Sequence, residues 1–137
     1  MKPVFVDTFF FLASLNKSDI CHDRAIAWLD AYDGPLLTTA WIVTEVADAL
    51  AGVDHRHGFG GFYQALIEDE RMSLIPADRA LWERGLALYL ERRDKEWSLT
   101  DCISFTVMNE RGLTEALTGD RHFQQAGFTV LLRDSSA

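Results

Sequence analysis

The sequence predicts an α/β fold in which right-handed crossovers join a parallel sheet covered by helices on both faces. Short apolar runs, the first at residues 3–6 and the last at 128–132, alternate with longer segments in which apolar residues recur at helical spacing. This alternation is typical of parallel sheets, because each connection must cross back over the sheet and usually does so as a helix. The 137 residues contain no evident linker or repeat, so one domain over 1–137 is expected.

The expected strands are short, apolar and bounded by turn residues. The run at 36–39 follows the Asp-Gly-Pro turn signal at 33–35. The segment 115–118 is too short for a helix and lies between Gly112 and Gly119, so a buried strand fits it. The full set of expected strands lies at residues 3–6, 36–39, 72–76, 115–118 and 128–132.

Helices are expected where apolar residues recur every three or four positions. The helix over 40–51 carries Glu45 in its second turn and ends at Gly52. The stretch 54–61 is rich in Gly and His, and we expect a flexible turn there, since the G-x-G-x-x-G pattern of a nucleotide-binding loop is absent. The full set of expected helices lies at residues 9–13, 21–32, 40–51, 62–69, 78–94, 97–111 and 120–125.

Composition is that of an ordinary globular protein, with 48% hydrophobic and 25% charged residues. No apolar run approaches the roughly 18 residues of a membrane span, and residues 1–7 lack a signal-peptide pattern. Cys21 and Cys102 have no partner motif, which favours a reducing, cytoplasmic location. The net charge of −8 argues against nucleic-acid binding by phosphate neutralisation alone, unless cations or a local basic patch offset the field.

Acidic residues are placed where the predicted strands end and the helices begin. Asp7 follows the first strand, Asp120 lies just beyond the fourth, and Asp101 lies near the start of a helix. Glu45 lies near the same edge, and ligands of open α/β sheets bind outside the carboxyl ends of the strands. Helix capping is the alternative for each acid alone, because Ser98-x-x-Asp101 matches a capping box and Asp120 is a good N-cap.

A cluster of these carboxylates would need a cation. Two carboxylates about 5 Å apart repel by roughly 3 kcal/mol at an effective dielectric constant of 20. Several such pairs in one cleft must take up protons or bind a cation, and all-oxygen ligation suits Mg²⁺ or Mn²⁺. Such an ion can generate hydroxide from bound water, neutralise charge on a phosphodiester and attract a polyanion to an acidic protein.

Four short motifs resemble, in order and spacing, those of PIN domains, a family that includes the VapC-type toxins. The motifs are Phe5-Val-Asp7-Thr8, Thr44-Glu45-Val46-Ala47, Leu99-Thr-Asp101-Cys-Ile and Leu117-Thr118-Gly-Asp120-Arg-His-Phe123. The resemblance covers the whole chain and implies a three-layer α/β/α sandwich with a central parallel sheet of about five strands. It also implies a metal-dependent ribonuclease, usually a homodimer, which in the toxin members is held inactive by a small antitoxin protein.

The resemblance also implies roles for individual residues. The implied catalytic acids and metal ligands, acting directly or through water, are Asp7, Glu45, Asp101 and Asp120. Thr8 and Thr118 carry hydroxyls where the family often places supporting hydrogen-bonding residues. The implied reaction is attack of a metal-activated water on phosphorus in RNA, which leaves a 5′-phosphate and a 3′-hydroxyl.

An acidic ribonuclease would need a basic rim. Arg121, beside Asp120, is the best single choice for a substrate contact, although charged residues at this density are usually solvated surface. His122 also adjoins the site, but a surface role is favoured for it, and His55 and His57 lack partners spaced for zinc. The candidates for the basic rim are Lys17, Arg56, Arg92, Arg93, Lys95, Arg111 and Arg121.

Two other functions fit parts of the pattern. A non-catalytic PIN-like module could bind protein or RNA, but it would have no reason to keep four mutually repelling acids. A phosphatase with an aspartyl nucleophile would need an Asp two residues after Asp7, where Phe9 stands. Phe59, Phe62 and Tyr63 would pack either into the core or into a dimer or antitoxin groove. The favoured hypothesis is a Mg²⁺- or Mn²⁺-dependent endoribonuclease, the toxin of a type II toxin–antitoxin pair.

Overall fold

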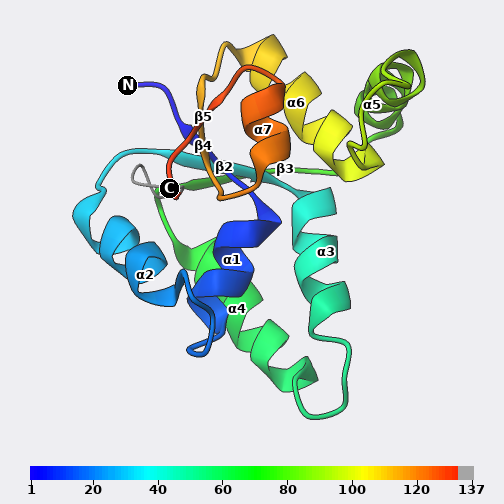
Figure 1. Ribbon diagram of the computed structural model, residues 1–137. Helices are drawn as coiled ribbons and strands as arrows, with labels where there is room; N and C mark the ends of the chain where they lie inside the picture. Colours follow the sequence, from blue (N-terminus) through cyan, green and yellow to red (C-terminus); the bar gives the residue numbers. More distant parts are fainter. Residues whose placement is uncertain (133–137) are drawn as a thin grey trace.

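A five-stranded parallel sheet forms the centre of the computed structural model, which describes residues 1–132 (Figure 1). The strand order is β3-β2-β1-β4-β5. The strands are β1 (Val4–Val6), β2 (Leu36–Thr39), β3 (Met72–Ile75), β4 (Glu115–Leu117) and β5 (Thr129–Val130). Each lies inside a run predicted from the sequence, and all neighbouring pairs are parallel. The predicted fold class is therefore confirmed.

Helices cover both faces of this sheet. They are α1 (Thr8–Leu15), α2 (His22–Ala31), α3 (Ala40–Ala49), α4 (Arg56–Glu68), α5 (Arg79–Glu91), α6 (Leu99–Arg111) and α7 (Arg121–Gln125). Figure 1 shows α1 to α4 on one side of the sheet and α6 and α7 on the other, with α5 packed against α6. The result is a three-layer α/β/α sandwich. Within residues 1–132, no helix has the length and apolar character needed to cross a membrane.

The segment 54–61 differs from the prediction. It was expected to be a flexible turn, but α4 begins at Arg56 and runs through the glycines of this segment. The reason is aromatic packing: the Phe59 ring lies 5.9 Å from the Phe62 ring, which in turn lies 5.0 Å from Phe11 of α1. Burial of these rings outweighs the roughly 1 kcal/mol that each glycine costs in a helix.

An aromatic cluster fixes α6 and α7 against the sheet. The Phe105 ring of α6 meets the Phe123 ring of α7 edge to face at 4.9 Å, and Phe123 lies 6.1 Å from Phe5 of β1. All three side chains are fully buried, as are Cys102 and Met108 on the same helix. These contacts hold the first turns of α6 and α7 in place relative to β1.

The sheet has a topological switch point between β1 and β4. The chain leaves β1 into α1 on one face of the sheet and leaves β4 into α7 on the other (Figure 1). Val6 pairs with Leu117 across these strands, so the next residues, Asp7 and Thr118, are neighbours at the carboxyl edge. Diverging connections at such a point leave a crevice, which is where ligands of open α/β sheets bind.

Candidate active site and metal centre

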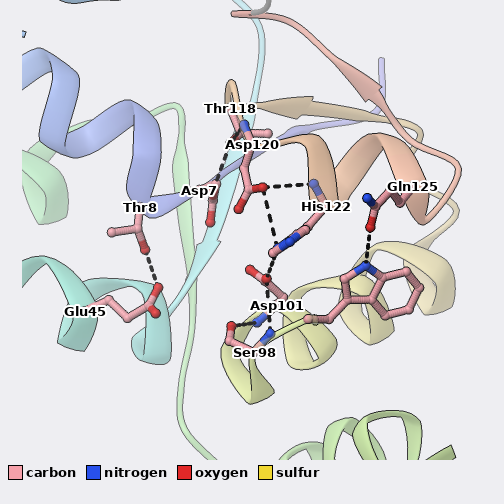
Figure 2. A network of polar contacts seen from close by, with 10 residues as sticks. Asp7, Thr8, Glu45, Ser98, Asp101, Thr118, Asp120, His122 and Gln125 are labelled. Atoms are coloured by element: carbon pink, nitrogen blue, oxygen red, sulfur yellow. Dashed lines mark hydrogen bonds and ion pairs between the residues drawn. The ribbon is translucent and has the colours of Figure 1, made fainter. Parts of the chain in front are cut away.

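Asp7 is the buried acid of the site. It occupies the N-cap position of α1, but its side chain makes no capping hydrogen bond. Its carboxylate Oδ2 instead accepts a hydrogen bond of 2.9 Å from Thr118 Oγ1, across the switch point (Figure 2). The residue is only 5% exposed, and burial raises its pKa to about 7. The charges of Asp101 and Asp120 raise this pKa further, and the Thr118 hydrogen bond opposes the shift.

Thr118 connects Asp7 to Asp120. Its hydroxyl donates to Asp7 and accepts a hydrogen bond of 3.0 Å from the Asp120 backbone N–H. Asp120 then caps α7, because its Oδ1 accepts a 2.9 Å hydrogen bond from the backbone N–H of His122. One buried hydroxyl therefore sets the positions of two acids that come from different strands.

Asp101 combines a structural role with a place in the site. It completes a capping box with Ser98: the Asp101 N–H donates to Ser98 Oγ at 3.0 Å, and the Ser98 N–H donates to Asp101 Oδ2 at 3.3 Å. Asp101 can therefore complete the capping box and still belong to the site, because its carboxylate faces Asp120 and His122 (Figure 2). Burial and the charge of Asp120 raise the Asp101 pKa, while the His122 hydrogen bond lowers it.

His122 belongs to the site, and the prediction of a surface role was wrong. Its ring Nδ1 lies 3.1 Å from Asp101 Oδ2 and 3.6 Å from Asp120 Oδ1, and its side chain is 23% exposed. In the tautomer that carries its proton on Nδ1, the ring donates this hydrogen bond to the ionised Asp101 carboxylate. The spacing Asp120-Arg-His122 could have indicated this position. An N-cap at Asp120 accepts from the backbone N–H of His122, which keeps His122 close to the Asp120 carboxylate.

Glu45 lies on the opposite side of Asp7 from Asp101 and Asp120 (Figure 2). It lies in the second turn of α3, and its Oε1 accepts a short hydrogen bond of 2.6 Å from Thr8 Oγ1. Burial is the largest cause that raises the pKa of Glu45, and the negative charges of Asp101, Asp48 and Asp120 raise it further. The Thr8 hydrogen bond opposes it.

Comparison with known proteins gives the family. The model of the PIN domain family matches residues 4–129. This chain belongs to the PIN domain family. A similar protein is the 23S rRNA-specific endonuclease VapC20 of Mycobacterium tuberculosis, 28% identical over 126 residues, which make up 91% of this chain and 95% of that protein.

Solved structures share the fold of this PIN domain. The crystal structure of Mycobacterium tuberculosis VapC20, described as a Sarcin-Ricin loop cleaving toxin, superposes with a TM-score of 0.82 at 24% identity and covers 92% of this chain and 96% of its own. A toxin–antitoxin complex from Klebsiella pneumoniae superposes with a TM-score of 0.65 at 19% identity, over 93% of this chain and 95% of its own.

The donor atoms of this PIN domain fit a hard divalent cation. Asp101, Asp120 and His122 each offer one ligand atom, and these atoms lie within 4.8 Å of one another. Carboxylate oxygens suit Mg²⁺ and Mn²⁺, and the imidazole nitrogen is better tolerated by Mn²⁺. Among the ion pairs of residues 1–132, none joins a lysine or arginine to Asp7, Glu45 or these aspartates. Within residues 1–132, the ion pairs of the carboxylate cluster therefore involve only the ring of His122.

The predicted supporting residues have different places. Thr8 and Thr118 both donate hydrogen bonds to site acids, Glu45 and Asp7 respectively. Arg121 is exposed on the first turn of α7, where it lines a hollow beside His122. The structure thus places the two hydroxyls inside the acid cluster and the arginine at its rim.

Proposed function

We propose that this PIN domain is a divalent-metal-dependent endoribonuclease and the toxin of a type II toxin–antitoxin pair. The observation that carries the proposal is the convergence of Asp7, Asp101 and Asp120 at the switch point, where no ion pair joins them to a lysine or arginine of residues 1–132. Family membership supports it, and so does VapC20, whose description is an endonuclease specific for 23S rRNA.

The four acids would hold the metal, directly or through water, and the protein pre-organises each of them. Thr118 orients Asp7, Ser98 and His122 orient Asp101, and α7 orients Asp120. A bound Mg²⁺ or Mn²⁺ would supply a water of lowered pKa and offset the negative charge of the phosphodiester. Because these carboxylates are already fixed by hydrogen bonds, little reorganisation accompanies the reaction.

Glu45 would act from the side opposite the Asp101–Asp120 pair. Thr8 engages its Oε1, which leaves Oε2 for a water or for a proton. Its pKa is raised, and a carboxyl with a raised pKa is better able to take a proton near neutral pH. Glu45 therefore fits a supporting role toward the attacking water.

Two protein partners accompany the proposed function, in the cytoplasm where RNA is available. We propose a small antitoxin, as in the Klebsiella pneumoniae complex, and a second copy of this chain. Apolar side chains that water would disfavour lie exposed along α4 and the turn before it. These are Val53 (90% exposed), Tyr63 (39%) and Ile67 (52%). A partner that covers them would remove this surface from water.

A cleavage assay on a structured RNA tests the proposal. The purified chain should cut RNA with Mg²⁺ or Mn²⁺, stop in EDTA, and leave 5′-phosphate and 3′-hydroxyl ends. Asp101→Asn should lower the rate at least about a hundredfold, whereas Asp30→Asn, an exposed residue of α2, should not. Circular dichroism of both variants checks folding. Equal cleavage by Asp101→Asn and the wild type would contradict the assignment.

A further inference from the structure

We propose that single-stranded RNA reaches the acids along a basic groove formed by the end of α5, the loop 92–98 and the start of α7. The residues assigned to RNA binding in this groove are Tyr89, Arg93, Lys95 and Arg121. The inference rests on the proposed function and extends it, because it identifies the surface that binds the substrate.

Two adjoining hollows make up the groove. One has a volume of about 620 Å³ and is lined by residues of 89–99, among them Tyr89, Arg93 and Lys95. The other, of about 300 Å³, is lined by Arg121, His122, Gln125 and part of the same loop. Lys95 and Glu96 line both, so the two hollows lie side by side along the loop.

The second hollow adjoins the carboxylate cluster through His122, which lines the hollow and whose ring contacts both Asp101 and Asp120. The two aspartates themselves are not among the residues that line it. A strand lying in the groove would place its phosphates over Arg121 and Lys95, and the next phosphodiester would pass His122 to reach the acids.

The charge of the groove is opposite in sign to that of the chain. The chain carries a net charge of −8, whereas the groove is lined by four basic residues and two acidic ones. The basic residues are Arg92, Arg93, Lys95 and Arg121, and the acidic ones are Asp94 and Glu96. A locally positive groove on an acidic protein gathers a polyanion at one place.

The arginines and lysine of the groove are not equivalent. Arg92 is already paired with Asp94, at 2.9 Å, and its guanidinium lies 4.9 Å from the centre of the Trp97 ring. Arg93 is exposed and Lys95 half-exposed, and both lie on the loop itself. We therefore assign the phosphate contacts to Arg93, Lys95 and Arg121, and a structural role to Arg92.

Trp97 makes the groove a pre-formed surface. The residue is 6% exposed, and its indole Nε1 donates a hydrogen bond of 3.1 Å to Gln125 Oε1 of α7 (Figure 2). Its ring also meets Phe105 of α6 edge to face at 5.0 Å. The loop is thus tied to the two helices that carry Asp101 and Asp120, so binding needs little ordering of the protein.

The Tyr89 ring offers a surface on which an RNA base can stack. It is 44% exposed at the end of α5 and lines the larger hollow beside the basic loop. Aromatic rings next to basic residues are the usual means of binding single-stranded nucleic acid, because every base presents a face that can stack. Backbone phosphates would bind the basic residues while one base stacks on the Tyr89 ring.

A binding assay in an Asp7→Asn background, which blocks turnover, tests this groove. Fluorescence anisotropy of a labelled single-stranded RNA would compare Arg93→Gln/Lys95→Gln with the matched control Lys17→Gln/Arg111→Gln. Both pairs remove the same charge. Lys17 and Arg111 were candidates for the basic rim from the sequence, but both are exposed and neither lines either hollow. The groove pair should raise Kd roughly tenfold or more and lower the slope of log K against log salt by about 1.4. The control pair should change Kd by less than about twofold.

Two further variants check that weaker RNA binding by the groove pair does not come from a local change in the fold of the loop 92–98. Arg121→Gln lies on a different element, α7, and should weaken binding in the same direction. Tyr89→Ala removes the stacking ring without any change in charge, so it should raise Kd about fivefold or more and leave the salt slope unchanged. Melting temperatures equal to that of the parent protein would show that each variant is folded.

The outcomes distinguish the proposal of an RNA-binding groove from the proposal of nuclease activity. If the groove pair binds RNA as tightly as the control pair, the groove is overturned even when the wild type cleaves RNA. If the groove pair selectively weakens binding but the wild type cleaves nothing with metal, the groove is supported and the nuclease proposal fails. Absence of any RNA binding by the parent protein would overturn both.

Discussion

At the residue scale, the Thr118 hydroxyl links two acids of the cluster, because it forms hydrogen bonds with both Asp7 and Asp120. It donates to Asp7 Oδ2 and accepts from the Asp120 N–H, and it is fully buried. Removal of such a group leaves a buried acceptor and a buried donor without their partner. The positions of both acids should therefore depend on this one oxygen atom.

Thr118→Val tests that dependence because it keeps the shape of the side chain and removes the hydroxyl. Mn²⁺ affinity and the rate of RNA cleavage should each fall about 10- to 100-fold, the usual effect of a lost supporting hydrogen bond at a metal site. Thr118→Ser keeps the hydroxyl and should stay close to wild type. Electron paramagnetic resonance of free Mn²⁺ measures the affinity. A valine variant that binds Mn²⁺ like the wild type would show that the hydroxyl has no positioning role.

Asp7 should make the protein less stable as the pH rises. Its pKa is about 7 in the folded protein against a usual value of 3.8, so folding favours the protonated form. The penalty is absent below pH 3.8, grows between the two values and is complete above about pH 7. Asp7→Asn cannot ionise, so its stability relative to wild type in EDTA should improve with pH, by on the order of 1–4 kcal/mol at pH 8.

Urea unfolding of both proteins at a series of pH values measures this effect. The stability difference between Asp7→Asn and the wild type should be smallest under acidic conditions and largest above neutrality. A constant difference across the series would mean that burial does not disfavour the Asp7 carboxylate. The same variant should lose RNA cleavage, so the residue that limits stability would also be one that activity requires.

Sequence reasoning at this scale weighed capping against a place in the site as alternatives, whereas the structure combines the two positions. Asp101 and Asp120 were weighed as either caps or site residues, and both turn out to be caps whose carboxylates also face the site. His122 was assigned to the surface, because linear spacing does not show where a ring points. The cap of α7 was predictable from the sequence, but the contact of the His122 ring with Asp101 depends on how α6 and α7 pack together.

At the scale of elements, the contact between α5 and α6 supports the loop that carries the basic groove. Gly85 of α5 lies directly against Ile103 of α6, where an added Cβ would come 3.0 Å from the Ile103 Cα and closer still to its Cγ1. Only a residue without Cβ allows the two helices to approach so closely. Because α6 carries Asp101, this contact also bears on the acid cluster.

Gly85→Ala should destabilise the protein, although alanine favours helix. The propensity gain is about 1 kcal/mol, but overpacking against a neighbouring backbone costs about 1–3 kcal/mol. A net loss of up to about 2 kcal/mol is expected, measured by urea unfolding. Gly60→Ala on α4 is the control, since an added Cβ there meets nothing within 4 Å, and it should stabilise by about 0.5–1 kcal/mol. Stabilisation by both changes would contradict the tight packing of α5 on α6.

Elements were predictable where local pattern and burial agree. The strands are buried and bounded by turns, so apolar runs located them, and β2 matches its predicted run at both ends. The first turns of α4 were missed because their glycines argue locally for a turn. The contact of Phe62 with Phe11 of α1 joins distant parts of the chain, and no local pattern contains that information.

At the scale of the whole molecule, the topology brings the acids together. The hydrogen bond between Thr118 and Asp7 joins residues 111 positions apart, across the strands whose connections diverge. Sequence order and the PIN resemblance predicted this convergence, whereas composition alone pointed away from nucleic acid because of the net charge of −8. Within residues 1–132, basic side chains of the loop 92–98 and Arg121 gather beside His122, which contacts the acids.

The central claim is that these converging carboxylates bind a divalent ion, and thermal unfolding with added Mn²⁺ tests it most directly. Wild type and Asp30→Asn should melt at rising temperatures as Mn²⁺ increases, with a gain of about 2.7 kcal/mol when the ion reaches 100 times its Kd. The double variant Asp7→Asn/Asp101→Asn, which lacks two of the acids, should show almost no rise. An equal rise in all three proteins, or no rise in wild type at millimolar Mn²⁺, would contradict the account.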